Sequence, residues 1–327
     1  MTLRWAILGT SFISHTVAAA IAGSEGSVAM VVAGRNADRL RAFQNQYGIA
    51  HAVASVEEAV AHREVDAVYI GLPNHVHHTA VMAAASAGKA ILSEKSLTVT
   101  RNQATQLLDA VRERVFFVEG LMYLAHPLIP RFTDVLTDGR LGELRAVHAS
   151  YSANIAHLVN PSGRGAIFNL GCYPMSLTQL VIDLLEGEGA FATAAISGFG
   201  RVVDGNVCDT TALVRTNGGT LASVHTSETC GMAWNFAVQG TNGTLRFLSN
   251  PWLPGRGTNT FEWAPYEGAV ETFTVHDPLD AFDHQIRLVE RAVANGQLEV
   301  LRPSPRLDDS RALLDALVNW ESRAKAE

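Results

Sequence analysis

The first 120 residues alternate between short apolar runs and longer segments in which apolar residues recur every three or four positions. Short apolar runs bounded by Gly or Pro are typical of buried parallel strands, whereas the longer spacing is typical of helices. The predicted strands cover residues 4–8, 28–33, a short stretch at 53, 66–70, 90–93 and 115–118. The predicted helices cover residues 12–22, 37–47, a short stretch up to 61, 75–87 and 101–114. Strands separated by helices indicate βαβ units, so the pattern predicts an α/β fold with a doubly wound parallel sheet.

The second half of the chain has a different pattern, in which longer alternating runs follow one another with few helices between them. The predicted strands cover residues 144–154, 192–203, 210–216, 220–226, 234–240 and 243–248. Residues 217–219 and 241–243 are Gly- and Asn-containing hairpin turn signals. A helical tail is predicted at 280–295 and 308–325, whereas residues 259–271 give no readable pattern.

Length and composition narrow the class of protein. A chain of 327 residues with 47% apolar and 17% charged residues is globular and long enough for two domains. The net charge of -7 argues against a nucleic-acid or anionic membrane partner, and no apolar run is long enough to span a bilayer. The first residues lack the features of a signal peptide. Three cysteines without CxxC spacing indicate neither a disulfide framework nor a zinc site, so we expect a cytoplasmic protein without a metal.

Lys95, one of only three lysines, follows the predicted strand that starts at residue 90 and forms the sequence Glu94-Lys95-Ser96. Parallel-sheet proteins bind ligands at the carboxyl ends of their strands. A lysine there can donate a hydrogen bond to a substrate hydroxyl or carbonyl, and partial burial would lower its pKa. The alternative interpretation is a surface lysine that merely follows a strand.

The first strand-to-helix turn reads Gly9-Thr10-Ser11-Phe12-Ile13-Ser14, where a dinucleotide fold places G-x-G-x-x-G. Only the first glycine is present. Ser11 replaces the second with a small hydroxyl that could cap the helix or contact phosphate, and Ser14 replaces the third. An ordinary strand-to-helix turn is the alternative, but the position at the first strand of a βαβ series favours a dinucleotide site.

The end of the second strand bears on cofactor choice. A carboxylate there binds the ribose hydroxyl of NAD, whereas arginine accommodates the phosphate of NADP. This chain has Gly34, Arg35 and Asn36, with no carboxylate before Asp38. Because the Arg35 guanidinium could pair with a phosphate or stack on adenine, we expect NADP rather than NAD.

Three motifs now stand in a specific order: Gly9-x-Ser11, Pro73-Asn74-x-x-His77 and Glu94-Lys95-Ser96. In this order they resemble the glucose-fructose oxidoreductase / inositol dehydrogenase (Gfo/Idh/MocA) family, whose hallmark is E-K-P after a T-P-N-x-x-H loop. The resemblance implies a Rossmann domain, placed at residues 1–121, and an α/β domain with a large, mostly antiparallel sheet at 122–327. It also implies a homodimer or homotetramer formed through the second sheet. Ser96 departs from the family proline and leaves this loop less rigid.

A second motif covers residues 163–174, where the family carries G-G-G-x-L-x-D-x-G-x-[HY]. The resemblance makes Tyr173 the acid/base, and a phenol near Lys95 would have its anion stabilised. Asn169 stands in place of the family aspartate; an amide can orient a hydroxyl but carries no charge. Tyr173 with its following proline, and Tyr123 in a run similar to E-A-x-M-Y, resemble the dihydrodiol / D-xylose dehydrogenase branch. A tyrosine packed at a helix start is the alternative for Tyr173.

Together these motifs imply an NADP-dependent oxidoreductase that transfers a hydride between nicotinamide and a sugar, cyclic polyol or related secondary alcohol or ketone. Lys95 and Tyr173 would be catalytic, Glu94 would hold Lys95 in place, and Tyr123, Asn169 and Tyr173 would contact the substrate. The expected cofactor-binding residues are Gly9, Thr10, Ser11, Phe12, Ile13, Gly34, Arg35, Asn36, Gly71, Leu72, Pro73, Asn74, His77, Glu94 and Lys95. Two alternatives stay open: a glycoside-cleaving or epimerising enzyme that retains its cofactor, and a non-catalytic NADP sensor.

Overall fold

The chain forms two compact units in a computed structural model, which describes residues 2–326. The first unit comprises residues 2–125 together with Ala281–Arg311, and the second comprises His126–Asp280 together with residues 312–326. The prediction divided the chain once, at residue 121. The compact units differ from that division because residues 281–311 return to the first unit.

The first unit is built on a six-stranded parallel sheet with the strand order β3-β2-β1-β4-β5-β6. The strands are β1 (Leu3–Leu8), β2 (Ser27–Ala33), β3 (His51–Val53), β4 (Ala67–Ile70), β5 (Ala90–Glu94) and β6 (Phe117–Gly120). The helices between them are α1 (Phe12–Ala22), α2 (Ala37–Tyr47), α3 (Val56–Ala61), η1 (Asn74–Val76), α4 (His77–Ser86), α5 (Arg101–Val111) and η2 (Met122–Ala125). The strand order reverses between β1 and β4, the point where doubly wound sheets bind their ligands. The predicted doubly wound sheet is therefore confirmed.

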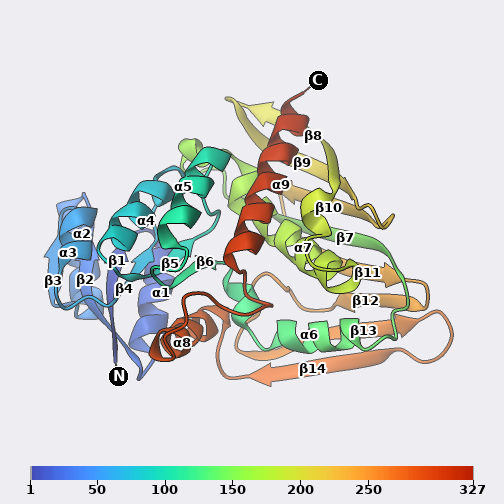
Figure 1. Cartoon of the computed structure of the whole chain (residues 1–327), viewed down its shortest axis with the longest axis horizontal. Helices are drawn as coiled ribbons and strands as arrows, with labels where there is room; N and C mark the ends of the chain where they lie inside the picture. Colours follow the sequence, from blue (N-terminus) through green and yellow to red (C-terminus); the bar gives the residue numbers. More distant parts are fainter. Residues whose placement is uncertain (1, 327) are drawn as a thin grey trace. The chain divides into compact units, whose positions relative to one another are not determined.

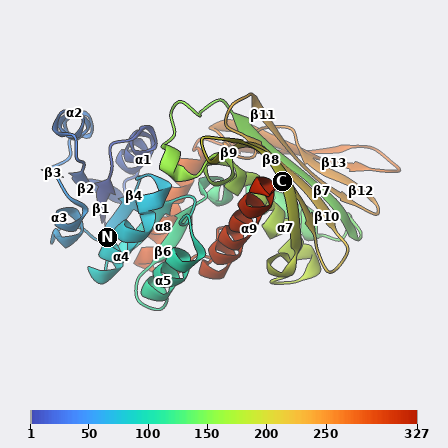
Figure 2. The same cartoon turned by 90° about the horizontal axis from the view of Figure 1, so that it is seen from above.

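Helices cover both faces of this sheet. Helices α3, α4 and α5 lie on one face, whereas α1, α2 and α8 (Ala281–Ala294) lie on the other (Figures 1 and 2). Helix α8 buries Ile286 and Val289 in the same apolar cluster as Ile21 of α1 and Trp5 of β1. This apolar stripe is the physical reason why a segment far along the chain belongs to the first unit.

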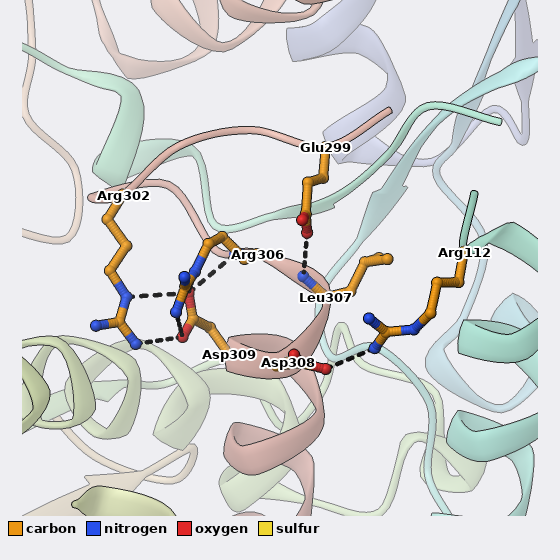
Figure 3. Close-up of polar contacts among 7 residues, drawn as sticks. All are labelled: Arg112, Glu299, Arg302, Arg306, Leu307, Asp308 and Asp309. Atoms are coloured by element: carbon orange, nitrogen blue, oxygen red, sulfur yellow. Dashed lines mark hydrogen bonds and ion pairs between the residues drawn. The ribbon is translucent and has the colours of Figure 1, made fainter. Parts of the chain in front are cut away.

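Ionic contacts fix the segment that leads from α8 to α9 (Leu307–Lys325) (Figure 3). The Asp309 carboxylate accepts hydrogen bonds from Arg302 at 2.5 Å and from Arg306 at 3.2 Å. Its neighbour Asp308 pairs with Arg112 at 2.5 Å. Both acids lie in the first turn of α9, where negative charge is favourable to the helix dipole.

The second unit contains an eight-stranded sheet with the order β14-β13-β12-β11-β7-β10-β9-β8, in which only β7 and β10 pair in parallel. The strands are β7 (Leu144–Ala153), β8 (Ala195–Val203), β9 (Asn206–Arg215), β10 (Leu221–Ser227), β11 (Met232–Gly240), β12 (Gly243–Phe247), β13 (Gly257–Pro265) and β14 (Glu271–Asp277). The expected large, mostly antiparallel sheet is thus confirmed. Strands β13 and β14 were missed by the sequence analysis.

Helices cover one face of the second sheet and leave the other open. The covering elements are α6 (Leu128–Thr137), η4 (Ile167–Gly171), α7 (Cys172–Glu186) and the later part of α9, while η3 (Pro161–Gly163) and η5 (Phe191–Thr193) are short turns before η4 and after α7. Trp320 of α9 donates a hydrogen bond to Thr210 of β9 at 2.8 Å. On the open face Phe199 is 81% exposed and Leu213 is 55% exposed. Within residues 2–326, none of the helices is both long and apolar enough to cross a bilayer.

Candidate active site

The turn after β1 brings two backbone segments into close contact. Gly9 has a φ of +103°, and a Cβ added to it would lie 2.8 Å from the carbonyl oxygen of Gly71. The Ser11 hydroxyl accepts a hydrogen bond from the Ser14 amide at 3.4 Å and donates one to Gly71 at 3.1 Å. Ser11 therefore caps α1, as one of its two predicted roles required, and joins the turn to the loop after β4.

The first residues of α1 lie beside this turn. A helix N-terminus carries backbone N–H groups without intrahelical partners and a partial positive charge, so it attracts phosphate. Thr10 is half-buried there, and the Phe12 side chain is 87% exposed at the first helical position. Ile13 is half-buried behind it.

The residues that bear on cofactor choice lie directly after β2. Arg35 is exposed, and Asn36 caps α2 by accepting a hydrogen bond from the Arg39 amide at 2.9 Å. Asp38 lies in the first turn of α2. Asn36 therefore has a structural role, whereas the Arg35 guanidinium is on the surface next to Gly34.

His77 connects two loops of the predicted site. Its Nδ1 lies 2.9 Å from the Ser96 carbonyl oxygen, and its Nε2 lies 2.7 Å from the Leu72 carbonyl oxygen. Burial lowers the pKa of this fully buried imidazole to about 4, although both carbonyl contacts act to raise it. A neutral ring can donate to only one of the two. His77 thus holds the loop containing Pro73 and Asn74 against the loop after Lys95.

Two buried carboxylates flank Lys95. Glu94 accepts a hydrogen bond from the Tyr69 hydroxyl at 3.1 Å, and burial raises the pKa of Glu94 against the opposing effect of the Lys95 charge. Glu119 accepts a hydrogen bond from the Leu97 amide at 2.7 Å, and burial raises its pKa to about 7. Glu94 is thus held to Tyr69 on one side of the half-buried lysine, and Glu119 holds the Leu97 backbone on the other.

In the second unit, Tyr173 is the second residue of α7, the helix that follows a π-helical turn. Asn169 lies in that turn, η4, one helical turn before Tyr173, and π-helical turns occur frequently at functional sites. The Tyr173 ring is 5.5 Å from the Tyr151 ring in an edge-on contact. Burial raises the pKa of Tyr151 to about 12, so that phenol stays protonated at ordinary pH.

Asn169 has a buried partner that the sequence analysis missed. Its amide nitrogen donates a hydrogen bond to the Glu228 carboxylate at 2.9 Å. The available signal was a charged residue directly after the strand that ends at Ser227, the same signal that drew attention to Lys95. Arg164, which interrupts the family glycine run, pairs with Glu321 and lies over the Phe168 ring.

The predicted catalytic groups belong to different units, and their pairing stays a prediction. Lys95 belongs to the first unit, whereas Tyr173 and Asn169 belong to the second. Tyr123 lies in η2 with its side chain fully buried. Outside these positions, His51, His62 and Glu64 place possible ligand atoms within 4.8 Å of one another, and we assign no ion to them.

Comparison with known proteins identifies the family. Residues 3–118 match the model of the oxidoreductase family with an NAD-binding Rossmann fold, and residues 131–246 match the GFO/IDH/MocA C-terminal domain. An uncharacterized oxidoreductase of Rhizobium meliloti is 32% identical over 77% of this chain and 76% of its own. The trans-1,2-dihydrobenzene-1,2-diol dehydrogenase of Bos taurus is 30% identical over 78% of this chain and 76% of its own. The chain belongs to the Gfo/Idh/MocA family of NAD(P)-dependent oxidoreductases, which confirms the resemblance found in the sequence.

Solved structures show the same fold. The 3-ketoreductase KijD10 of Actinomadura kijaniata, in complex with TDP-benzene and NADP, has a TM-score of 0.82 and 27% identity over 97% of this chain and 96% of its own. Levoglucosan dehydrogenase in complex with NADH and levoglucosan has a TM-score of 0.81 over 99% of this chain and 97% of its own. Its identity is 18%, so this likeness concerns the fold alone.

Proposed function

We propose that this protein is an NADP-dependent oxidoreductase that transfers a hydride between nicotinamide and a sugar, cyclic polyol or related secondary alcohol or ketone. The observation that carries this proposal is the close turn of Gly9 and Ser11 against Gly71, at the reversal point of a parallel sheet. The family membership supports an oxidoreductase, and the names of the relatives support a CH–OH group as the site of reaction.

The residues at this turn fit a dinucleotide. Gly9 has no side chain to keep the diphosphate from the backbone, and a Cβ there would meet the Gly71 carbonyl at 2.8 Å. The exposed ring of Phe12 offers an apolar surface at the start of α1, and a nicotinamide ring needs such a surface to pack against. We therefore assign the phosphates to the first turn of α1 and the nicotinamide to the side that Phe12 lines.

The choice of NADP rests on Arg35. Solved relatives of this fold contain NADP in one case and NADH in another, so the fold does not decide between them. An exposed guanidinium directly after β2, with no carboxylate before Asp38, supports pairing with a 2′-phosphate. Asn36 is engaged in capping α2, so Arg35 is the residue that we assign to this phosphate.

For the chemistry we assign separate roles to an amine and a phenol. When bound, the nicotinamide accepts or supplies the hydride. Tyr173 exchanges the proton of the substrate hydroxyl, and Lys95 donates a hydrogen bond to the substrate oxygen and favours the phenolate form of Tyr173. Glu94 and Glu119 hold the lysine segment in position through the contacts of Tyr69 and Leu97.

Two measurements test this function. Fluorescence titration with NADP and NAD should show binding of NADP, and a panel of sugars, polyols and ketones followed by nicotinamide absorbance should reveal turnover. The Lys95→Ala and Tyr173→Phe variants should each lose at least a hundredfold in turnover, because general acid–base catalysis typically contributes about 10²–10⁴-fold. Lys325→Ala, which removes a lysine ion-paired with Glu321, is the matched control and should keep wild-type turnover. Turnover of Lys95→Ala within threefold of wild type would refute the assignment.

The assembly is a separate part of the proposal. We propose a homodimer or homotetramer formed through the open face of the second sheet, on which Phe199, Leu213 and Leu221 are exposed. We also propose a cytoplasmic location, with no nucleic acid or membrane as partner; none of the three cysteines forms a disulfide. Light scattering should give a dimer or larger mass for the wild type and a lower mass for Phe199→Glu.

A further inference from the structure

Asn169 occupies the position at which the family motif carries an aspartate, yet the structure places a carboxylate against it. The amide nitrogen of Asn169 lies 2.9 Å from Oε2 of Glu228. Both side chains are buried, with exposures of 8% for Asn169 and 4% for Glu228. A carboxylate with no proton can only accept hydrogen bonds, so the NH₂ end of the amide faces it and the orientation of the amide is fixed.

The backbone of Glu228 is held by strands and loops on both sides. Its amide donates to the Cys208 carbonyl at 3.0 Å, and its carbonyl accepts from the amides of Ile155 at 3.0 Å and Ala156 at 2.9 Å. Glu228 therefore connects the end of β10 to β9 and to the loop after β7. A side chain on so firmly held a backbone keeps its direction toward Asn169.

The charge of Glu228 is not compensated by a cation. Across residues 2–326 no lysine or arginine forms an ion pair with it, whereas nearby Asp209 pairs with Arg201 at 2.6 Å. Burial raises the pKa of Glu228; hydrogen bonds from Asn169 and Cys208 oppose this rise, and the charge of Asp209 adds to it. Burying a carboxylate with no counter-ion costs stability, which hydrogen bonds and a raised pKa only partly offset, and such groups gather at functional sites.

We propose that Glu228 supplies the carboxylate that position 169 lacks, so that Asn169 and Glu228 together bind a second hydroxyl group of the substrate beside Tyr173. This inference rests on the function proposed above and narrows its substrate class to polyhydroxylated compounds. The hydroxyl donates a hydrogen bond to the Glu228 carboxylate, and a substrate with hydrogen or an ether oxygen at that carbon cannot supply this hydrogen bond. Selectivity for polyols over simple secondary alcohols follows.

An exchange of the two side chains separates this role from a purely structural one. Glu228→Gln should raise the KM for a polyol substrate by roughly ten- to hundredfold, as expected for loss of a buried charged hydrogen bond, with NADP affinity unchanged. The double variant Asn169→Asp/Glu228→Gln returns a carboxylate to the same pair and should recover to within about threefold of wild type. Asn169→Asp alone sets two carboxylates at this distance and should shift the acidic limb of the pH profile upward, because both cannot be ionised together.

A matched control neutralises another buried carboxylate of the same sheet. Glu262→Gln, at a residue paired with Arg246, should leave KM unchanged. Binding of the polyol to NADP-loaded protein is measured by calorimetry alongside the kinetics. If wild type turns over and Glu228→Gln matches it in KM, this inference fails while the proposed function stands. If Glu228→Gln is impaired but the double variant does not recover, the role is structural and the inference again fails. If wild type neither binds nor converts any polyol, both fail.

Discussion

Asp309 offers a sharp test of how the segment between α8 and α9 is held. Its carboxylate accepts hydrogen bonds from the guanidinium groups of Arg302 and Arg306, and its side chain is 13% exposed. Asp309→Asn keeps the shape of the side chain but leaves two cations, 19% and 27% exposed, without their carboxylate. The adjacent Asp308, which pairs with Arg112, provides the control because both acids lie in the first turn of α9.

The magnitude follows from burial. Breaking a fully buried ion pair costs about 3–5 kcal/mol, whereas an exposed pair contributes about 0–1 kcal/mol. The pairs of Asp309 lie between these limits, so we expect Asp309→Asn to cost about 2–3 kcal/mol. Asp308 is 78% exposed and Arg112 is 45% exposed, so Asp308→Asn should cost less than about 1 kcal/mol. Any effect of the helix dipole is common to both variants and cancels in their difference.

Urea unfolding followed by circular dichroism measures the difference, and its pH dependence gives a second check. Although burial alone would raise it, hydrogen bonds from Arg302 and Arg306 hold the pKa of Asp309 below its ordinary value. A lowered pKa contributes stability above the unfolded value, about 3.9, and this contribution is lost as pH falls through the folded value. The gap between wild type and Asp309→Asn should therefore narrow below about pH 4. Equal costs for the two variants at pH 7 would refute the reasoning.

Three further outcomes are expected. Burial raises the pKa of Glu119 to about 7, above its unfolded value of about 4.3, so the stability of wild type should fall as pH rises between these values. Urea unfolding at pH 5 and pH 8 should show this fall for wild type and not for Glu119→Gln. Gly9→Ala should cost about 1–3 kcal/mol and weaken NADP binding in the fluorescence titration, because its φ of +103° is strained for alanine and the Cβ meets Gly71. Arg35→Ser should weaken NADP binding roughly tenfold and leave NAD binding unchanged, and equal losses for both cofactors would contradict its assignment.

The elements predicted best are those whose end residues themselves mark where the element starts and stops. Helix α1 and helix α2 begin and end at the predicted residues because Ser11 and Asn36 cap their starts, and Gly48 ends α2 in the left-handed conformation. Strand β13 was missed because buried polar residues, Asn259 and Glu262, break its alternation. Such residues pair with distant partners that a local pattern does not contain.

The parts of the candidate site that lie within one short run of sequence were predicted, and those formed by residues far apart in the sequence were not. The turn at Gly9 and the segment at Lys95 were found because each lies directly after a strand, with its characteristic residues in one short run. Glu228 was missed because its partner Asn169 lies 59 positions away, and its place directly after a strand does not identify that partner. The same holds for α8: its apolar spacing predicts a helix but does not show which unit that helix packs on.

The return of α8 to the first unit has a consequence for how the protein is made. On a ribosome, residues 2–125 emerge first, with the sheet face that Ile286 and Val289 later cover still open to water. The whole of His126–Asp280 must then be synthesised before α8 exists, which takes roughly ten to thirty seconds at about 5–20 residues per second. During that interval the nascent sheet exposes an apolar face, and a chaperone that shields it would raise the yield of native protein.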